Sequence, residues 1–354
     1  MSRHNNIFYL FILLLLSTSS ASAQTQTIGA MAELTGNFAR SGEDCKRGYE
    51  VAKATSLLGV SSDSRLVIVD NQNDPKVAIS EFRRLKASEK ASIIITTRSP
   101  VGLALNPISK QTNTPLIGIV GHPKFISENP YAVRAFPSAK DESGTLAGYV
   151  ENQPEEQIAV VTLEDDYFLS FSNEFKAQLN KTAVVFSETV PPSEMDFAPI
   201  ILRIKASGSD AIFANITPSQ FLPFVKKLRE LGVNNRVYSN FLIGSSDIRT
   251  TLGSEGDGIV FVEVDYRKTN FLAALKRVTG ATDSSAIGYS CYVAMNYALT
   301  AINQATQKKV SIIDTLNSVS EIDTLDGVVP ILNREAKFSI AVKMLQDTEI
   351  KTLQ

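Results

Sequence analysis

The chain has 354 residues, of which 44% are hydrophobic and 20% charged, and its formal net charge is −2. Acidic and basic side chains are mixed without long runs of one sign, so the sequence offers no basic patch for nucleic acid or an anionic membrane. The chain is also longer than one hydrophobic core usually supports, and we therefore expect two lobes.

Residues 1–23 have the pattern of a cleavable signal peptide. Arg3 gives a positive start, residues 7–16 form an apolar run, and Ala21-Ser22-Ala23 offers the small-x-small pattern that signal peptidase requires. The apolar run is too short to span a membrane, and no cysteine lies at the cleavage point to carry a lipid anchor. We expect cleavage after Ala23 and a mature chain that diffuses in a bacterial periplasm, without stable membrane insertion.

The mature chain alternates short apolar segments with longer helical stretches. Strands are expected at 27–32, 65–70, 92–96 and 115–120, with helices at 40–58, 75–90 and 100–111. After Pro137 the alternation restarts, with helices near 141–151, 167–180, 197–207 and 218–231 and strands at 157–163, 183–190, 210–215, 236–240 and 258–264. Apolar runs without a period of two are typical of strands buried on both faces, with the helices as right-handed crossovers. The pattern predicts an α/β protein with two doubly wound parallel-sheet lobes, divided near residue 137.

Local signals support this scheme at the helix ends. Asp74 and Pro75 fit an N-cap and a first-turn proline, and Gly232 lies where a helix would end. Two further segments follow the second predicted sheet, an apolar helix at 286–305 and a strand-like run at 337–345. A chain that passes back and forth between the lobes would explain both.

The residues that most catalytic sites need are scarce. His122 is the only histidine of the mature chain, and the Walker, G-x-S-x-G and G-x-G-x-x-G motifs are absent from the sequence. A single histidine is too few for a histidine-rich zinc site and argues against a Ser-His-Asp triad. We expect a protein that is not an enzyme and that holds no metal and no cofactor.

Two cysteines remain, Cys45 and Cys291. In an oxidising compartment they can form a disulfide, but their spacing alone fits two buried free thiols equally well. Both readings stay open at this point.

Nine segments in order resemble the periplasmic solute-binding proteins of the Leu/Ile/Val type that serve ABC importers. They include "IGAMAELTGNFARSGEDCKRGYEVA", "VDNQNDPKVAISEFRRL", "ITTRSPVGLA", "PLIGIVGHP", "DDYF" and "IGYSCYVAMNYAL", and together they cover essentially the whole mature chain. The resemblance implies two α/β lobes with three hinge crossings and a ligand held in the cleft between them. We expect the crossings near Phe136 to Ser138, Val264 to Tyr266, and Gly327 to Pro330. The first lobe would then hold 24–137 and 266–327, and the second 138–265 and 328–354.

Candidate site residues of the first lobe follow from strand ends, where open parallel sheets bind ligands. Ser99 fits a helix N-cap and Pro100 a first helical residue, an arrangement that favours a carboxylate, and the family supplies a serine hydroxyl here. Gly121 fits the family's backbone contact, whereas His122 replaces a threonine and either donates a hydrogen bond or only lines the cleft. Phe38 either covers an apolar group of the ligand or is an exposed loop aromatic. Arg98 either faces the cleft or is a solvated charge, and we expect the second.

The second lobe departs from the family's pattern in two places. Tyr167 matches a tyrosine that packs on the ligand in the family. Thr217 takes the place of another tyrosine, and Phe241, beside Asn240, takes the place of the acid that pairs with the ligand's ammonium. A buried ammonium without a carboxylate partner is costly.

The resemblance and these departures together suggest a ligand. We expect a small organic acid, aromatic or branched aliphatic, with an apolar amino acid as the contender if an acid of the loop 164–166 turns inward. The expected partners are this small-molecule carboxylate and the membrane permease of an ABC importer, and the protein is expected to be a monomer. Two rival functions remain, a periplasmic sensor subunit that presents its closed form to a receptor, and an amide-hydrolysing enzyme on the same scaffold.

Overall fold

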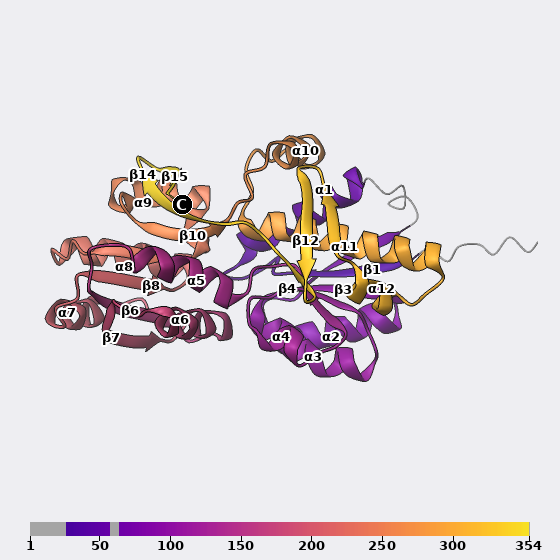
Figure 1. Cartoon of the computed structure of the whole chain (residues 1–354), viewed down its shortest axis with the longest axis horizontal. Coiled ribbons are helices and arrows are strands. Elements are labelled where there is room, and N and C mark those ends of the chain that lie inside the picture. Colours follow the sequence, from indigo (N-terminus) through magenta and orange to yellow (C-terminus); the bar gives the residue numbers. More distant parts are fainter. Residues whose placement is uncertain (1–25, 57–63, 354) are drawn as a thin grey trace, which may run out of the picture.

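The computed structural model describes residues 26–56 and 64–353, which form two α/β lobes side by side (Figure 1). The predicted signal peptide, residues 1–23, lies outside the described residues. Within the described part of the chain, no helix has the length and apolar content that crossing a membrane requires.

The first lobe is built on a sheet with the strand order β11-β12-β13-β5-β4-β3-β1-β2. Strands β1 to β5 and β13 are parallel, whereas β11 and β12 pair antiparallel at the edge. The strands are β1 Thr27–Ala32, β2 Arg65–Asp70, β3 Ala91–Thr97, β4 Leu116–Ile119, β5 Ala132–Arg134, β11 Glu321–Thr324, β12 Gly327–Leu332 and β13 Glu335–Ala336. The helices are α1 Ala39–Thr55, α2 Pro75–Ala87, α3 Ser99–Gln111, α4 Lys124–Ser127, α10 Thr269–Thr279, α11 Ala286–Lys308 and α12 Ile312–Ser318.

The second lobe is built on a sheet with the strand order β15-β14-β10-β9-β8-β6-β7. Strands β6 to β10 are parallel, and β14 and β15 complete the edge antiparallel. The strands are β6 Gln157–Leu163, β7 Ala183–Val190, β8 Ala211–Asn215, β9 Arg236–Ser239, β10 Val260–Val264, β14 Ile340–Gln346 and β15 Glu349–Thr352. The helices are α5 Ala139–Val150, α6 Asp166–Gln178, α7 Ala198–Ala206, α8 Pro218–Glu230 and α9 Ser246–Leu252, with short 3-10 turns η2 Phe241–Gly244 and η3 Gly253–Gly256.

The fold class predicted from the alternation is therefore confirmed. Strands such as β1 and β8 are buried along their whole length, as apolar runs without a period of two require. Helix α2 begins as predicted, because the Asp74 carboxylate accepts hydrogen bonds from the amides of Lys76 and Val77, with Pro75 in the first turn.

The chain passes between the sheets three times. It leaves the first sheet after β5 and returns after β10, and it makes its last passage between β13 and β14. The last crossing predicted at Gly327 to Pro330 is wrong, because residues 327–336 still pair within the first sheet, where Glu335 registers with Arg134. Arg134 and Glu335 also form an ion pair at 3.1 Å. Figure 1 shows the yellow C-terminal segment running from the β12 edge to β14.

A disulfide joins α1 to α11 on the first lobe. Cys45 and Cys291 are bonded, with 5.1 Å between their Cα atoms. Of the two alternatives that the sequence left open, the structure therefore has the disulfide and not the free thiols. The helices touch closely beside it, since a Cβ atom on Gly48 would lie 2.1 Å from the carbonyl oxygen of Gly288. Glycine is required at this crossing, and the disulfide holds the helix pair in register.

Candidate functional site between the lobes

Two adjoining cavities lie between the lobes. The larger, which we call the wide compartment, has a volume of about 250 Å³, and the smaller, the narrow compartment, about 30 Å³. Both are lined by Phe38 and Ile287 of the first lobe and by Phe241 of the second. The two compartments therefore form one cleft to which both lobes contribute walls.

The start of α3 forms one wall of the narrow compartment. Ser99 is the first residue of the helix and Pro100 the second, and both line the compartment. Ser99 was expected to be the N-cap, but Arg98 occupies that position and no side chain caps the helix. The Ser99 hydroxyl instead accepts a hydrogen bond from the amide of His122 at 3.3 Å and keeps its own proton to donate. With the positive end of the helix dipole, this wall suits a carboxylate.

Arg98 faces the cleft, and the expectation of a solvated side chain is wrong. Its guanidinium stacks 3.7 Å from the centre of the Phe38 ring and donates a 2.9 Å hydrogen bond to the Ser41 hydroxyl. Its Nε lies 3.6 Å from the buried carboxylate of Glu33, and its side chain is 11% exposed. Arg98 takes a backbone φ of 65°, in the left-handed region. It lines the narrow compartment, whereas Phe38, on which it stacks, lines both.

Gly121 lies where the lobes touch. It lines the narrow compartment, and a Cβ atom here would be 2.6 Å from Cε2 of Tyr167 in the second lobe. Only glycine therefore allows the tyrosine ring to lie against the end of β4. Gly121 and Tyr167 thus form a direct contact between the two lobes.

The neighbouring His122 does not line either compartment. Its Nδ1 accepts a hydrogen bond from the amide of Lys124 at 3.2 Å, and its carbonyl accepts one from Arg134. Burial lowers the pKa of His122, which agrees with an unprotonated Nδ1. His122 therefore organises its own loop, and its backbone amide rather than its side chain reaches Ser99.

Two aromatic residues of the second lobe close the cleft. Tyr167 lines the narrow compartment, and its hydroxyl donates a 2.6 Å hydrogen bond to the buried carboxyl group of Glu142. Burial raises the pKa of Glu142 to about 8. Phe241 packs edge-on against Tyr167 and Phe136, with ring centroids 6.0 and 5.4 Å apart. Phe241, which was expected to take the place of the family's acid, is thus an apolar wall of this cleft.

Thr217 and Asn240 line neither compartment. Thr217 lies at the N-cap of α8, where its hydroxyl pairs with the side chain of Gln220 at 3.1 Å. The Asn240 amide donates to Asn215 and Ile216, and its oxygen accepts from the amide of Leu242. Both residues hold the loops that carry the cleft walls, and their polar groups are used within the protein.

Asp165 is the acid of the loop 164–166 that turns inward. It lines the narrow compartment while capping α6, with a 2.9 Å hydrogen bond from the amide of Tyr167. Burial raises its pKa, and the charge of Arg98 acts in the opposite direction. Asp165 thus offers a negative group opposite Arg98.

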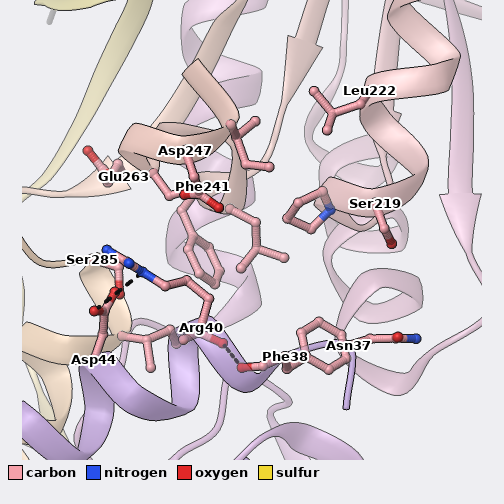
Figure 2. A pocket seen from close by; sticks show the side chains of 16 residues that line it. Asn37, Phe38, Arg40, Asp44, Ser219, Leu222, Phe241, Asp247, Glu263 and Ser285 are labelled. Carbon is pink, nitrogen blue, oxygen red and sulfur yellow. Dashed lines mark hydrogen bonds and ion pairs between the residues drawn. The ribbon is translucent and has the colours of Figure 1, made fainter. Parts of the chain in front are cut away.

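Most walls of the wide compartment were not predicted. They come from the first turns of α1 and α11, from α8 and from the segment after β9 (Figure 2), and include Ser41, Asp44, Leu222, Leu242, Ile248 and Ile287. These residues carry no motif of their own, because they meet only when strand ends of the two lobes face each other. The early stretch "LTGNFARSGEDC" was the one available signal, since it supplies Phe38, Ser41 and Asp44 together.

Comparison with known proteins agrees with this geometry. The sequence profile of the family described as periplasmic binding protein matches residues 25–340. A Leu/Ile/Val-binding protein homologue from Brucella melitensis is 19% identical over 318 residues, 86% of each chain. An amino acid binding protein from Pseudomonas aeruginosa is 25% identical over 246 residues, but this match spans only 63% of that relative and 64% of this chain.

A solved structure has the same fold. The solute-binding protein of an ABC transporter from Rhodopseudomonas palustris, in complex with 4-hydroxybenzoate, superimposes with a TM-score of 0.84 at 20% identity, over 93% of this chain and 96% of that one. Because the family profile covers most of the sequence, the chain belongs to the periplasmic binding protein family, of the type that includes the Leu/Ile/Val-binding proteins.

Proposed function

We propose that the protein is the periplasmic solute-binding component of an ABC importer and captures a small carboxylate-bearing solute. The observation that carries this proposal is the start of α3, where Ser99 lines a cleft that both lobes enclose, at the positive end of the helix. In this proposal the solute's carboxylate lies against Ser99, and its body faces the second lobe. The predicted signal peptide, cleaved after Ala23, would deliver the chain to the periplasm.

The favoured solute is an organic acid with an aromatic or branched aliphatic body. Phe241 gives an apolar wall where an α-ammonium group would need a partner, and burying an unpaired ammonium costs several kcal/mol, on the order of 3–5. The 4-hydroxybenzoate complex of the Rhodopseudomonas palustris protein supports the same class. An apolar amino acid is the alternative, because Asp165 lines the narrow compartment and two relatives are named as an amino acid binding protein and a Leu/Ile/Val-binding protein homologue.

The mechanism is capture by closure. A solute that touches Ser99 on one lobe and Tyr167 or Phe241 on the other gains all its contacts only when the lobes are closed, so it stabilises the closed form by its differential affinity. The permease would then recognise the closed pair of lobes. The protein is proposed to act as a monomer.

Isothermal titration with two panels tests the proposal. One panel holds leucine, isoleucine and valine, and the other holds their deaminated acids together with benzoate. We expect binding in the acid panel. Tight binding of leucine or valine with no heat from the deaminated acids would contradict the organic-acid proposal while preserving the solute-binding function, and no binding in either panel would contradict both.

A further inference from the structure

The wide compartment has apolar walls and two buried acids, Asp44 of the first lobe and Glu263 of the second (Figure 2). Glu263 accepts a hydrogen bond from Lys343 at 3.0 Å. The apolar part is formed by Phe38, Leu222, Phe241, Leu242, Ile248 and Ile287. At the α1 side, Asp44 lies beside Ser285, the N-cap residue of α11. A solute body that fills this compartment would therefore meet apolar side chains along its length and a carboxyl group at its end.

One carboxylate oxygen of Asp44 takes part in ion pairs but in no hydrogen bond among the described residues. The residue is 2% exposed, and its Oδ1 is buried without a hydrogen bond among the described residues. The cationic nitrogens of Arg40 and Arg47 lie 3.7 and 3.5 Å from Oδ1, beyond ordinary hydrogen-bond length. Buried polar atoms are nearly always hydrogen-bonded in folded proteins, so an unused one on a cavity wall indicates a missing donor.

The charges around Asp44 select the kind of donor. Arg40 and Arg47 already compensate the carboxylate, so a cationic group of the solute would be repelled by both guanidinium groups. Burial raises the pKa of Asp44, and the Ser285 hydroxyl and the two arginines oppose that shift. A neutral hydroxyl supplies the missing hydrogen bond without adding charge to this environment.

The two ends of the cleft are connected by shared walls. Ser99 lines the narrow compartment and Asp44 the wide one, and Phe38, Phe241 and Ile287 line both. A solute whose carboxylate lies at Ser99 would therefore extend past these three side chains toward Asp44.

We propose that the solute carries a hydroxyl group remote from its carboxylate and that Asp44 accepts a hydrogen bond from it, which makes Asp44 a specificity-determining residue. This inference rests on the proposed function, because the solute's carboxylate must occupy the Ser99 wall for the far end to reach Asp44. Ser285, beside Asp44, accepts a hydrogen bond from the amide of Gly288 at 3.3 Å and so keeps its hydroxyl proton available toward Asp44.

Pairs of acids that differ by one hydroxyl test the inference by titration. The probes are 4-hydroxybenzoate with benzoate, and 3-(4-hydroxyphenyl)propionate with 3-phenylpropionate, which covers two lengths. For the wild-type protein we expect the hydroxylated member of at least one pair to bind about tenfold or more tightly, the size expected for a hydrogen bond to a charged acceptor.

Variants assign that preference to Asp44. In Asp44→Ala the affinity ratio within the pair should fall to about one while the plain acid still binds, and in Asp44→Asn the ratio should fall several-fold. Glu43→Gln is the matched control, because it removes a neighbouring negative charge on α1 whose side chain is 41% exposed, and it should keep the wild-type ratio. Circular dichroism and melting temperature establish which variants are folded, and Asp44→Asn decides the matter if Asp44→Ala is not.

The outcomes separate the two proposals. Acids that bind without preference for the hydroxylated member, or a preference that survives in the folded Asp44 variants, overturn the Asp44 inference and leave the solute-binding proposal intact. An equal loss of preference in Glu43→Gln also overturns it, because the effect would then be general electrostatics. Failure of every acid to bind overturns both.

Discussion

The Ser99 hydroxyl is the side-chain group on which the carboxylate end of the proposed site depends most. Ser99→Ala removes the donor while leaving the helix start intact, since Ser99 caps nothing. A hydrogen bond to a charged group contributes about 1.5–3 kcal/mol, so the affinity for the bound acid should fall by about tenfold or more in titration calorimetry. Thr112→Val, at the other end of α3, is the control and should bind normally. An unchanged affinity of Ser99→Ala would remove Ser99 from the site.

Glu142 makes stability depend on pH. Its pKa is about 8 in the folded protein because of burial, against an ordinary value of 4.5, so the folded state holds this proton more tightly than the unfolded chain. The contribution of this group is fully present below pH 4.5 and is lost as pH rises through 8. In Glu142→Gln the side chain can still accept the hydrogen bond from Tyr167. The free energy of unfolding of this variant, relative to the wild type, should therefore increase between pH 5 and 9, by up to about 4 kcal/mol.

Urea unfolding of the ligand-free proteins at several pH values measures this difference. The comparison with the variant cancels the effect of the other titrating groups on stability, including Asp44 and Asp165, whose pKa values burial also raises. Parallel stability curves for the two proteins across this range would show that Glu142 keeps an ordinary pKa.

At this scale the sequence placed residues better than it assigned their roles. Ser99, Gly121, Tyr167 and Phe241 line the cleft because the ends of parallel strands determine where loops meet. Arg98 was misjudged because its direction depends on a positive φ and on the Phe38 ring, neither of which the sequence displays. Thr217 and Asn240 are polar residues at strand ends as well, but such residues serve equally well as caps and loop braces.

At the scale of elements, the pairing of α1 with α11 holds the first lobe's side of the cleft. Both helices begin near the wide compartment, which Asp44 and Ile287 line, and they are joined by the disulfide between Cys45, the residue after Asp44, and Cys291, one turn after Ile287. Replacing both cysteines by alanine should lower the free energy of unfolding by about 2–4 kcal/mol. Urea unfolding without reductant measures the loss, and an unchanged transition midpoint, or free thiols in the unfolded wild type, would contradict the bond.

The last crossing shows what the pattern of elements leaves open. Alternation of strands and helices predicts parallel sheets, but β11 to β13 follow one another without helices between them. They extend one edge of the first sheet, where Glu335 pairs with Arg134, which lies about 200 residues earlier in the chain. The antiparallel pairing of β11 to β13 and the long-range parallel pairing of β13 with β5 follow from no local period in the sequence. The strand at 337–345 was predicted, whereas the lobe in which the chain lies just before it was not.

At the scale of the whole molecule, length and alternation were sufficient to predict two lobes, whereas the contacts between the lobes were not predicted. The ring of Tyr167 lies against Gly121, and Phe241 against Phe136, so apolar surface of both lobes meets beside the cleft. Beside these contacts lies the wide compartment, with a volume of about 250 Å³. We expect the solute to supply the remaining interactions that favour the closed form.

The central claim is that a carboxylate solute closes the two lobes over itself. Small-angle X-ray scattering of the purified mature protein, alone and with a saturating concentration of the acid that titration identifies, tests it directly. The account predicts a smaller radius of gyration with the acid, and a much weaker response of Ser99→Ala at the same concentration. An unchanged radius of the wild-type protein at saturation would contradict it.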